Sequence, residues 1–256
     1  MNICLFTPEE ISMPLKIEDE RAQHILKILH KKEGEYFTAG IIGGKAGLAK
    51  IISITDSISF SFEGQSDGKP LNRLKMIIGF PRPIQLKRLL RDIAALGVCQ
   101  VHLTGTELGE KSYLQSTLVE KGNAYKMLLD GTVQAGSTHV PELFLHKNLR
   151  ECINHLEEDE KKNEGNVDLK LALDNVNPNS SLKMAIKDKI KNNDVRDNSP
   201  YVIAAIGSER GWTDNERLLL ESHGYIRCGM GERIMRTETA ATVAGSIILN
   251  EMGVLC

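Results

Sequence analysis

Two glycine-rich segments near the carboxyl end of the chain carry the residue types best suited to binding a small ligand. The first, Ile-Gly-Ser-Glu-Arg-Gly-Trp, covers residues 206–212 and follows the apolar run 201–205. The second, Gly-Met-Gly-Glu-Arg-Ile-Met-Arg-Thr-Glu-Thr-Ala, covers residues 229–240 and follows the run 225–228. Open α/β sheets bind ligands at the carboxyl ends of their strands, and glycine lets the main chain approach a ligand closely. The pattern therefore predicts that both segments border one ligand site.

A dinucleotide site of the Rossmann type is disfavoured. Gly229-Met-Gly231 begins a G-x-G-x-x-G motif, but position 234 is isoleucine and not the third glycine. No strand ending in an acidic residue about 20 positions later follows it, as the ribose of a dinucleotide would require.

The order of expected elements divides the chain into two domains. Residues 1–70 are typical of short strands with glycine turns and one helix over 19–29, which fits a small β-barrel. From residue 71, buried strands alternate with helices, which indicates an α/β domain around a mostly parallel sheet. Its strands are expected at 74–80, 98–103, 142–145, 170–174, 201–206 and 225–228, and its helices at 84–96, 119–133, 148–158, 214–222 and 238–252. We interpret the charged stretches 157–168 and 187–199 as solvated insertions.

Composition places the chain among globular proteins and excludes several other classes. Of its 256 residues, 41% are hydrophobic and 26% are charged, which excludes a largely disordered chain or a fibre. No apolar run approaches the roughly 18–20 residues of a membrane helix, and no signal peptide is visible, so we expect a cytoplasmic protein without a membrane partner. The 5 cysteines form no CxxC pair, and neither Cys nor His has the short paired spacing of a zinc site. We therefore expect reduced thiols and no metal.

Positive charge is concentrated locally in a chain whose formal net charge is −2. Residues 71–95 carry 6 lysines and arginines against a single aspartate, and most of them belong to one predicted helix or the Pro-Arg-Pro turn before it. Such a group suits contacts with nucleic-acid phosphates, with a solvated helix face as the alternative. The residues considered as contacts to nucleic acid are Lys27, Lys31, Arg82, Lys87, Arg88, Arg91 and Arg210.

The two glycine-rich segments together resemble the RsmE family of ribosomal RNA methyltransferases, within the knotted SPOUT superfamily. The family pattern is close to IGPEGG(F/W)…LG…ILR-ETA, and this chain has IGSERGW…MGERIMRTETA. Weaker similarity covers the rest of the chain, including the helix at 21–30, the stretch 73–97 and the stretch 134–141.

The resemblance implies a fold, a cofactor and a reaction. The implied fold is α/β, with a SPOUT-type trefoil-knot methyltransferase domain at 71–256 and a small PUA-like β-barrel RNA-binding domain at 1–70. The implied enzyme uses S-adenosyl-L-methionine to methylate N3 of a uridine in 16S ribosomal RNA of the small ribosomal subunit, as a homodimer. The residues expected to bind the cofactor are Leu173, Asp174, Gly207, Glu209, Gly211, Met230, Gly231, Ile234, Met235 and Ala240.

Methyl transfer to uracil N3 needs a positioned donor, loss of the N3 proton and stabilisation of the developing charge, and it needs no metal. Arg236 is the first choice for a catalytic or substrate-positioning cation, with a structural ion pair to Glu238 or Glu209 as the alternative. Glu238 is expected in the first turn of the last helix, where it caps, pairs or accepts the proton. Thr237 is a candidate N-cap of that helix.

Some residues depart from the family pattern and leave the target open. Ser208 replaces a common proline, and Arg210 replaces a common glycine. The alternatives are the same chemistry on transfer RNA or 23S ribosomal RNA, or an RNA-binding assembly factor without activity. The intact Arg-Thr-Glu-Thr at 236–239 favours an enzyme. Support for the dimer in the sequence is limited to the small-residue face formed by Ala240, Ala241, Ala244, Gly245 and Ser246.

Overall fold

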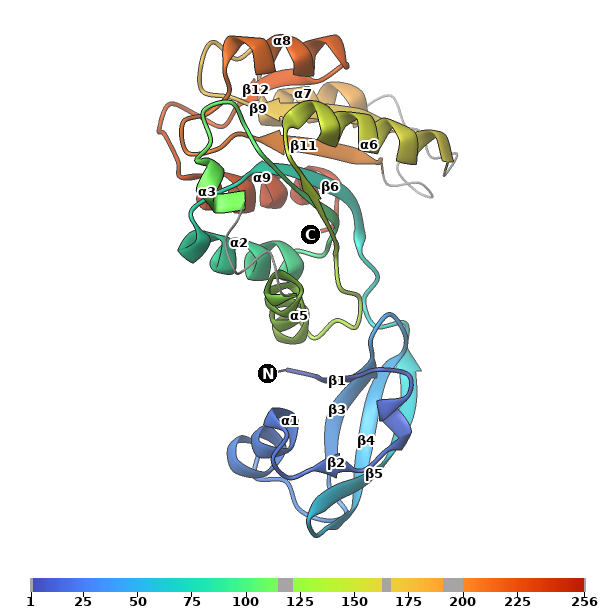
Figure 1. The fold of residues 1–256 in the computed structure, drawn as a ribbon. Coiled ribbons are helices and arrows are strands. Elements are labelled where there is room, and N and C mark those ends of the chain that lie inside the picture. The colour runs from blue at the N-terminus through green and yellow to red at the C-terminus, as the bar shows by residue number, and fades with distance from the viewer. Residues whose placement is uncertain (1, 115–121, 163–166, 191–199, 256) are drawn as a thin grey trace. The chain divides into compact units, whose positions relative to one another are not determined.

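The computed structural model describes residues 2–114, 122–162, 167–190 and 200–255 (Figure 1). The chain forms two compact units. The first contains Met1–Leu71 and Leu129–Val140, and the second contains Asn72–Leu128 and Pro141–Cys256. The boundary between functional domains after residue 70 remains a prediction. It places residues 129–140 in the second domain, whereas they belong to the first compact unit.

The first unit is built on a five-stranded sheet with the strand order β1-β3-β4-β5-β2. Its elements are β1 (Cys4–Phe6), η1 (Glu10–Ser12), β2 (Leu15–Lys16), α1 (Glu20–Gln23), η2 (His24–Ile28), β3 (Tyr36–Ile41), β4 (Ala46–Ile54) and β5 (Ser57–Ser66). Burial alternates along β4, as expected for a strand with one face on a core. Phe6, Ile25 and Phe37 belong to that core.

The helix expected at 19–29 is present as α1 continued by the π-helix η2. Asp19 is its N-cap and accepts a hydrogen bond from Arg21 N at 2.8 Å. Strands β3, β4 and β5 confirm the expectation of short strands in this part of the chain. Strand pairing leaves β1 and β2 at the two ends of the sheet, so closure into a PUA-like barrel remains a prediction.

The second unit contains the α/β arrangement that the alternation of strands and helices predicts. Its seven-stranded sheet has the order β10-β12-β9-β11-β6-β7-β8, and every neighbouring pair is parallel. The strands are β6 (Asn72–Gly79), β7 (Val98–Thr104), β8 (Glu142–His146), β9 (Leu169–Leu173), β10 (Ser180–Ser181), β11 (Val202–Ile206) and β12 (Ile226–Gly229). The helices are α2 (Pro83–Ala95), α3 (Lys111–Leu114), α6 (Leu149–Lys162), α7 (Leu182–Ile190), α8 (Asp214–Ser222) and α9 (Thr237–Glu251), while α5 (Asn123–Ala135) spans the division between the units.

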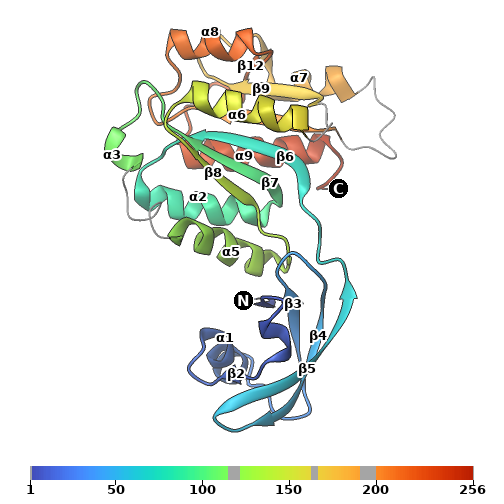
Figure 2. The same cartoon turned by 45° about the vertical axis from the view of Figure 1, so that its right-hand side comes forward.

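Helices cover both faces of this sheet, and α6 and α9 lie on opposite sides of its strands in Figure 2. Ile77 of β6 belongs to one core cluster with Ile153 of α6 and Leu220 of α8. Met76, the next residue along β6, points to the other side, where its sulfur lies 3.7 Å from the position that a Cβ on Gly245 of α9 would occupy. Both faces are thus buried, which explains the nearly continuous apolar sequence of the central strands.

The interpretation of residues 157–168 as a solvated insertion is wrong for the part that the structure describes. Helix α6 continues to Lys162. Asp159 on this helix pairs with Lys75 of β6 at 2.5 Å, and the Lys75 side chain is only 4% exposed. A buried ammonium group needs a negatively charged partner, so Asp159 of α6 stabilises the charge of Lys75 within the sheet. Residues 163–166 and 191–199 lie outside the described residues, and residues up to 190 belong to α7.

None of the helices that the structure describes combines the length and the apolar character required to cross a bilayer.

Candidate active site

A cavity of about 350 Å³ opens at the carboxyl ends of β9, β11 and β12. This is the edge of a parallel sheet where ligands are expected, and the volume lies in the usual range for small-molecule sites. Both glycine-rich segments line the cavity, together with the loop after β9. The lining residues are Leu173, Asp174, Asn175, Val176, Ile206, Gly207, Ser208, Glu209, Arg210, Gly211, Arg217, Cys228, Met230, Gly231, Arg233, Ile234, Met235, Thr237 and Ala240.

The first glycine-rich segment is a tight turn that requires its glycines. Gly211 has a φ of 73°, in the left-handed region, and its N–H donates to Ser208 O at 2.8 Å. A Cβ on Gly207 would lie 2.9 Å from the carbonyl carbon of Gly211. The turn therefore exposes main-chain groups to the cavity with few side chains in between.

The two glycine-rich segments are tied together by Thr237. Its hydroxyl donates to Gly207 O at 3.2 Å, and this contact is buried. Thr237 is the first residue of α9, whereas Arg236 is the N-cap residue and provides no capping side-chain bond. The expectation that Thr237 caps the helix is therefore wrong, because its hydroxyl points to the neighbouring segment.

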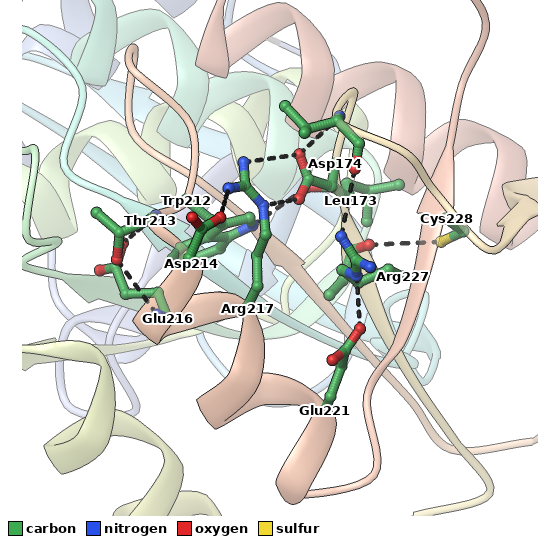
Figure 3. A network of polar contacts seen from close by, with 12 residues as sticks. Leu173, Asp174, Trp212, Thr213, Asp214, Glu216, Arg217, Glu221, Arg227 and Cys228 are labelled. Carbon is green, nitrogen blue, oxygen red and sulfur yellow. Dashed lines mark hydrogen bonds and ion pairs between the residues drawn. The ribbon is translucent and has the colours of Figure 1, made fainter.

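The third wall of the cavity is held by a buried ion pair (Figure 3). The Asp174 side chain is 1% exposed and accepts from Arg217 Nε at 2.6 Å. The same carboxylate accepts from Val176 N at 3.0 Å, which shapes the loop after β9. This carboxylate raises the pKa of Arg217. Behind the wall, buried Trp212 donates its indole N–H to Leu173 O at 3.2 Å, so Trp212 is a core residue here.

Positive side chains gather around the cavity. Arg210 and Arg233 line it and are exposed. Arg82, from the turn before α2, forms an ion pair with Glu209 at 3.2 Å, and the Glu209 carboxylate raises the pKa of Arg82. The exposed Arg210 and Arg233 suit an anionic partner such as a nucleic-acid strand.

The two candidate catalytic residues stand beside the cavity. Arg236 and Glu238 flank the lining residue Thr237 but are not among the described residues that line the space. Arg236 is exposed, and within the described part of the chain it forms no ion pair with Glu238 or Glu209. Glu238 is 8% exposed, and its Oε2 has no hydrogen-bond partner among the described residues. The expected position of Glu238 in the first turn of α9 is confirmed.

Comparison with known proteins identifies the family. Residues 68–249 match the family model described as the RNA methyltransferase domain. A ribosomal RNA small subunit methyltransferase E from Treponema pallidum is 38% identical, over 97% of this chain and 91% of the relative. A ribosomal RNA small subunit methyltransferase E 1 from Borreliella burgdorferi is 30% identical, over 97% of both chains.

The chain belongs to the ribosomal RNA small subunit methyltransferase E family. Its fold also matches that of the ribosomal RNA small subunit methyltransferase E from Neisseria gonorrhoeae, whose crystal structure contains bound S-adenosyl methionine. That likeness has a TM-score of 0.72 at 20% identity and covers 98% of this chain and 97% of the other. The family resemblance carried by the two glycine-rich segments is thus confirmed.

Of the departures from the methyltransferase E pattern, Ser208 has a structural explanation. It is 7% exposed, and Thr106 donates to its hydroxyl oxygen at 2.9 Å. Ser208 therefore occupies a buried position and accepts a hydrogen bond there, which a proline side chain could not do. Arg210 remains exposed at the cavity.

The structure gathers every residue expected to bind the methyltransferase E cofactor around the same cavity. Sequence reasoning missed Arg217, because its position depends on helix α8 and its partner Asp174 lies 43 positions away. The capping box of Thr213 and Glu216 at the start of α8 is a local signal for that helix, but it does not reveal which side chain faces the cavity.

The basic residues considered as RNA contacts fall on both units. Lys87, Arg88 and Arg91 are exposed on α2, as the helical spacing predicts. Lys27 is exposed and Lys31 is half-buried in the first unit.

Proposed function

We propose that this protein transfers the methyl group of S-adenosyl-L-methionine to N3 of a uridine in 16S ribosomal RNA of the small ribosomal subunit, in the cytoplasm. The observation that carries the proposal is the cavity formed jointly by the two glycine-rich segments and the loop after β9, in a chain of the methyltransferase E family.

The residues around the cavity fit the cofactor. Apolar side chains such as Leu173, Ile206 and Met235 suit the faces of an adenine ring. The tight turn of residues 207–211 offers main-chain groups at close range to ring nitrogens and ribose hydroxyls. When bound, the cofactor supplies a methyl group on a positively charged sulfur. The chain's own task is to orient the two reactants and to exclude water.

Arg236 supplies a cation where the RNA base must approach. The exposed guanidinium stands at the N-terminus of the 15-residue helix α9, whose dipole also favours negative charge. A uridine that loses its N3 proton carries negative charge on its carbonyl oxygens, and this charge is stabilised by a fixed cation. Arg236 therefore holds the base in its reactive form.

Glu238 is the proton acceptor in this proposal. Its Oε2 has no partner among the described residues, although the side chain is almost fully buried. This buried oxygen keeps its lone pairs for a proton, which it receives once the bound RNA base opens a path to it. Arg236 and Glu238 flank Thr237, which lines the cavity.

The finer features of the fold belong to the same proposal. We infer a trefoil knot in the C-terminal domain, a PUA-like barrel that binds RNA at the N-terminus, and a homodimer. The small-residue face of α9 supports the dimer less than the sequence suggests, because Ala241, Ala244 and Gly245 are buried within this chain. The partly exposed Ala240 and Ser246 remain available to a partner copy.

Labelled S-adenosyl-L-methionine and purified acceptors test the proposal. Small subunits from a strain lacking its own uridine-N3 methyltransferase should gain one methyl group, which mass mapping places on N3 of a 16S uridine. Label on transfer RNA or 23S ribosomal RNA would mean the same chemistry on another target, and the exposed Arg210 would be the first residue to examine. Cofactor binding without transfer to any acceptor would mean an assembly factor and would overturn the proposal.

A further inference from the structure

A second group of ligand-forming side chains lies away from the cavity, where α6 packs near the edge strand β8. His102 belongs to β7, His146 is the last residue of β8, and Cys152 lies on α6. One nitrogen of each histidine and the sulfur of Cys152 lie within 4.8 Å of one another, and all three residues are buried. We call these three residues the His–Cys cluster.

Hydrogen bonds fix the ring orientation of His102. Gln100 Nε2 donates to the Glu142 carboxylate at 2.8 Å, which leaves Gln100 Oε1 as an acceptor. His102 Nε2 lies 3.3 Å from this oxygen and donates its proton to it. His102 Nδ1 therefore carries a lone pair that points into the cluster, where it accepts a hydrogen bond from His146 Nε2 at 3.1 Å.

This arrangement is the one that metal-binding histidines use. Such histidines commonly donate the ring N–H that does not bind metal to an oxygen acceptor, and this bond aims the other nitrogen at the metal. Two imidazole nitrogens bound to one tetrahedral zinc ion at 2.0–2.1 Å lie about 3.3 Å apart. The separation of 3.1 Å between His102 Nδ1 and His146 Nε2 is close to this value.

Cys152 contributes a sulfur atom as a third potential ligand. Among the residues that the structure describes, its thiol has no hydrogen-bond partner, and the residue is 0% exposed. His155 lies three positions further along α6, and so on the same side of the helix. Its ring centre is 5.2 Å from that of His146 and 5.7 Å from that of His102.

We propose that His102, His146 and Cys152 bind one zinc ion. Binding forms one Zn–S bond and two Zn–N bonds, and the Cys152 thiol loses its proton to solvent. His146 carries its ring proton on Nδ1 once Nε2 binds the ion, so both imidazoles stay neutral. His155 borders the site, but its ring nitrogens do not belong to the group of ligand atoms that lie within 4.8 Å of one another, so a water molecule completes the tetrahedral coordination. The ion ties β8 and α6 to β7, and methyl transfer does not depend on its chemistry.

Cobalt is the probe for this site, because thiolate-bound Co²⁺ has an intense charge-transfer band that hydrated Co²⁺ lacks. The full chain is kept reduced, stripped of metal with a chelator, and titrated with Co²⁺. We expect saturation at one ion per chain, appearance of the band, and its loss when Zn²⁺ displaces Co²⁺. One proton should be released per ion in weakly buffered solution.

Three variants assign the band to the cluster. Cys152→Ala should abolish it, and Gln100→Leu should weaken Co²⁺ binding by roughly 10–100-fold while keeping the band. Cys99→Ala is the matched control, since Cys99 lies on β7 with its thiol bonded to Leu74 O, and it should leave the titration unchanged. Circular dichroism of the metal-free variants checks their folding, and the half-buried position of Gln100 keeps the test valid if Cys152→Ala does not fold.

Two outcomes would overturn the zinc site. One is no saturable Co²⁺ binding at micromolar concentration. The other is a thiolate band that survives in Cys152→Ala or disappears in Cys99→Ala. Both outcomes are independent of whether the protein methylates RNA.

Discussion

Arg236 combines an exposed charge with a position next to the cavity, and among the described residues it has no ion-pair partner. We expect Arg236→Ala to lower the rate of methyl transfer by about 10²–10³-fold, the usual effect of removing one group that stabilises an oxyanion. The affinity for S-adenosyl-L-methionine and the unfolding free energy should not change. Single-turnover assays and calorimetry measure these quantities.

The control for this substitution is Arg150→Ala, which removes an exposed arginine from α6 and should leave transfer unaffected. Equal turnover in Arg236→Ala and wild type would remove Arg236 from the mechanism.

The Asp174–Arg217 pair is the second residue-scale feature with a measurable consequence. The Asp174 side chain is 1% exposed and the Arg217 side chain 14%, so removing the arginine leaves a buried carboxylate without its cation. We expect Arg217→Met to lower the unfolding free energy by roughly 3 kcal/mol and to weaken cofactor binding, because the loop after β9 loses its anchor. Denaturant unfolding and calorimetry provide the two measurements.

The double variant Asp174→Asn with Arg217→Met measures how much of the stability comes from the interaction between these two side chains. Its loss of stability should be clearly smaller than the sum of the two single losses, because the uncompensated charge is gone. Additive losses would mean that the two side chains stabilise the fold independently.

At the scale of elements, the carboxyl end of β6 packs directly against the main chain of the first glycine-rich segment. A Cβ on Gly79 would collide with Ser208 N and lie 2.9 Å from the carbonyl carbon of Gly207. These are main-chain atoms, so the turn itself must move. We expect Gly79→Ala to cost about 1–3 kcal/mol, as overpacking does, and to weaken S-adenosyl-L-methionine binding at least tenfold.

Gly245→Ala on α9 is the matched control for Gly79→Ala. The atoms nearest its new Cβ belong to the side chains of Leu96, at 3.2 Å, and Met76, at 3.7 Å, and both can shift. A Gly79→Ala protein that binds the cofactor as tightly as Gly245→Ala would contradict the supporting role of β6.

In the first unit, Arg21 joins three elements. Its guanidinium donates to Leu5 O at 2.8 Å, Asp19 Oδ2 at 2.8 Å and Glu10 Oε2 at 3.0 Å. We expect Arg21→Met to destabilise this unit by roughly 2–3 kcal/mol at pH 7, the scale of hydrogen bonds to charged groups. Unfolding in urea, followed by a probe in the first unit, measures the loss.

The effect of Arg21→Met should depend on pH. Hydrogen bonds from Arg21 lower the pKa of both Glu10 and Asp19 in the folded protein. Because these pKa values are depressed, the stabilisation is complete above the unfolded values of 4.5 and 3.8 and is lost as the pH falls below them. The difference between wild type and variant should therefore shrink at pH 3. Lys16→Met, which removes an exposed charge from β2, should show no such trend.

At the scale of the whole molecule, the features predicted from sequence are those with local signals. Helix α8 is found at the expected residues because the capping box of Thr213 and Glu216 marks its start. The parallel sheet follows from apolar runs that alternate with amphipathic helices. Strands β1, β2 and β10 escape prediction because two or three residues show no periodicity.

The contacts that only the fold creates could not be predicted in the same way. Arg217 and Asp174 are 43 positions apart, and His102 and His146 are 44 positions apart. The expectation of no metal considered spacing along the chain, whereas the His–Cys cluster draws on two strands and a helix. The glycine-rich segments were predictable as neighbours because each follows a strand of one parallel sheet.

Binding of RNA by a chain with a formal net charge of −2 must depend on local positive surfaces. Lys87, Arg88 and Arg91 are exposed on α2, in the same unit as the cavity. If each contacts one phosphate of single-stranded RNA, replacing all three by alanine should reduce the magnitude of the negative slope of log K against log salt concentration by about 2, because each contact contributes roughly 0.7.

The control is a triple variant with the same change in charge, in which Lys147, Arg150 and Lys183 are replaced by alanine. It removes exposed cations from elsewhere on the chain and should leave the slope unchanged. Fluorescence anisotropy with a labelled 16S fragment at several salt concentrations measures both slopes. Equal slopes for the two variants would mean that α2 is an ordinary solvated helix face and that the RNA is held by other residues.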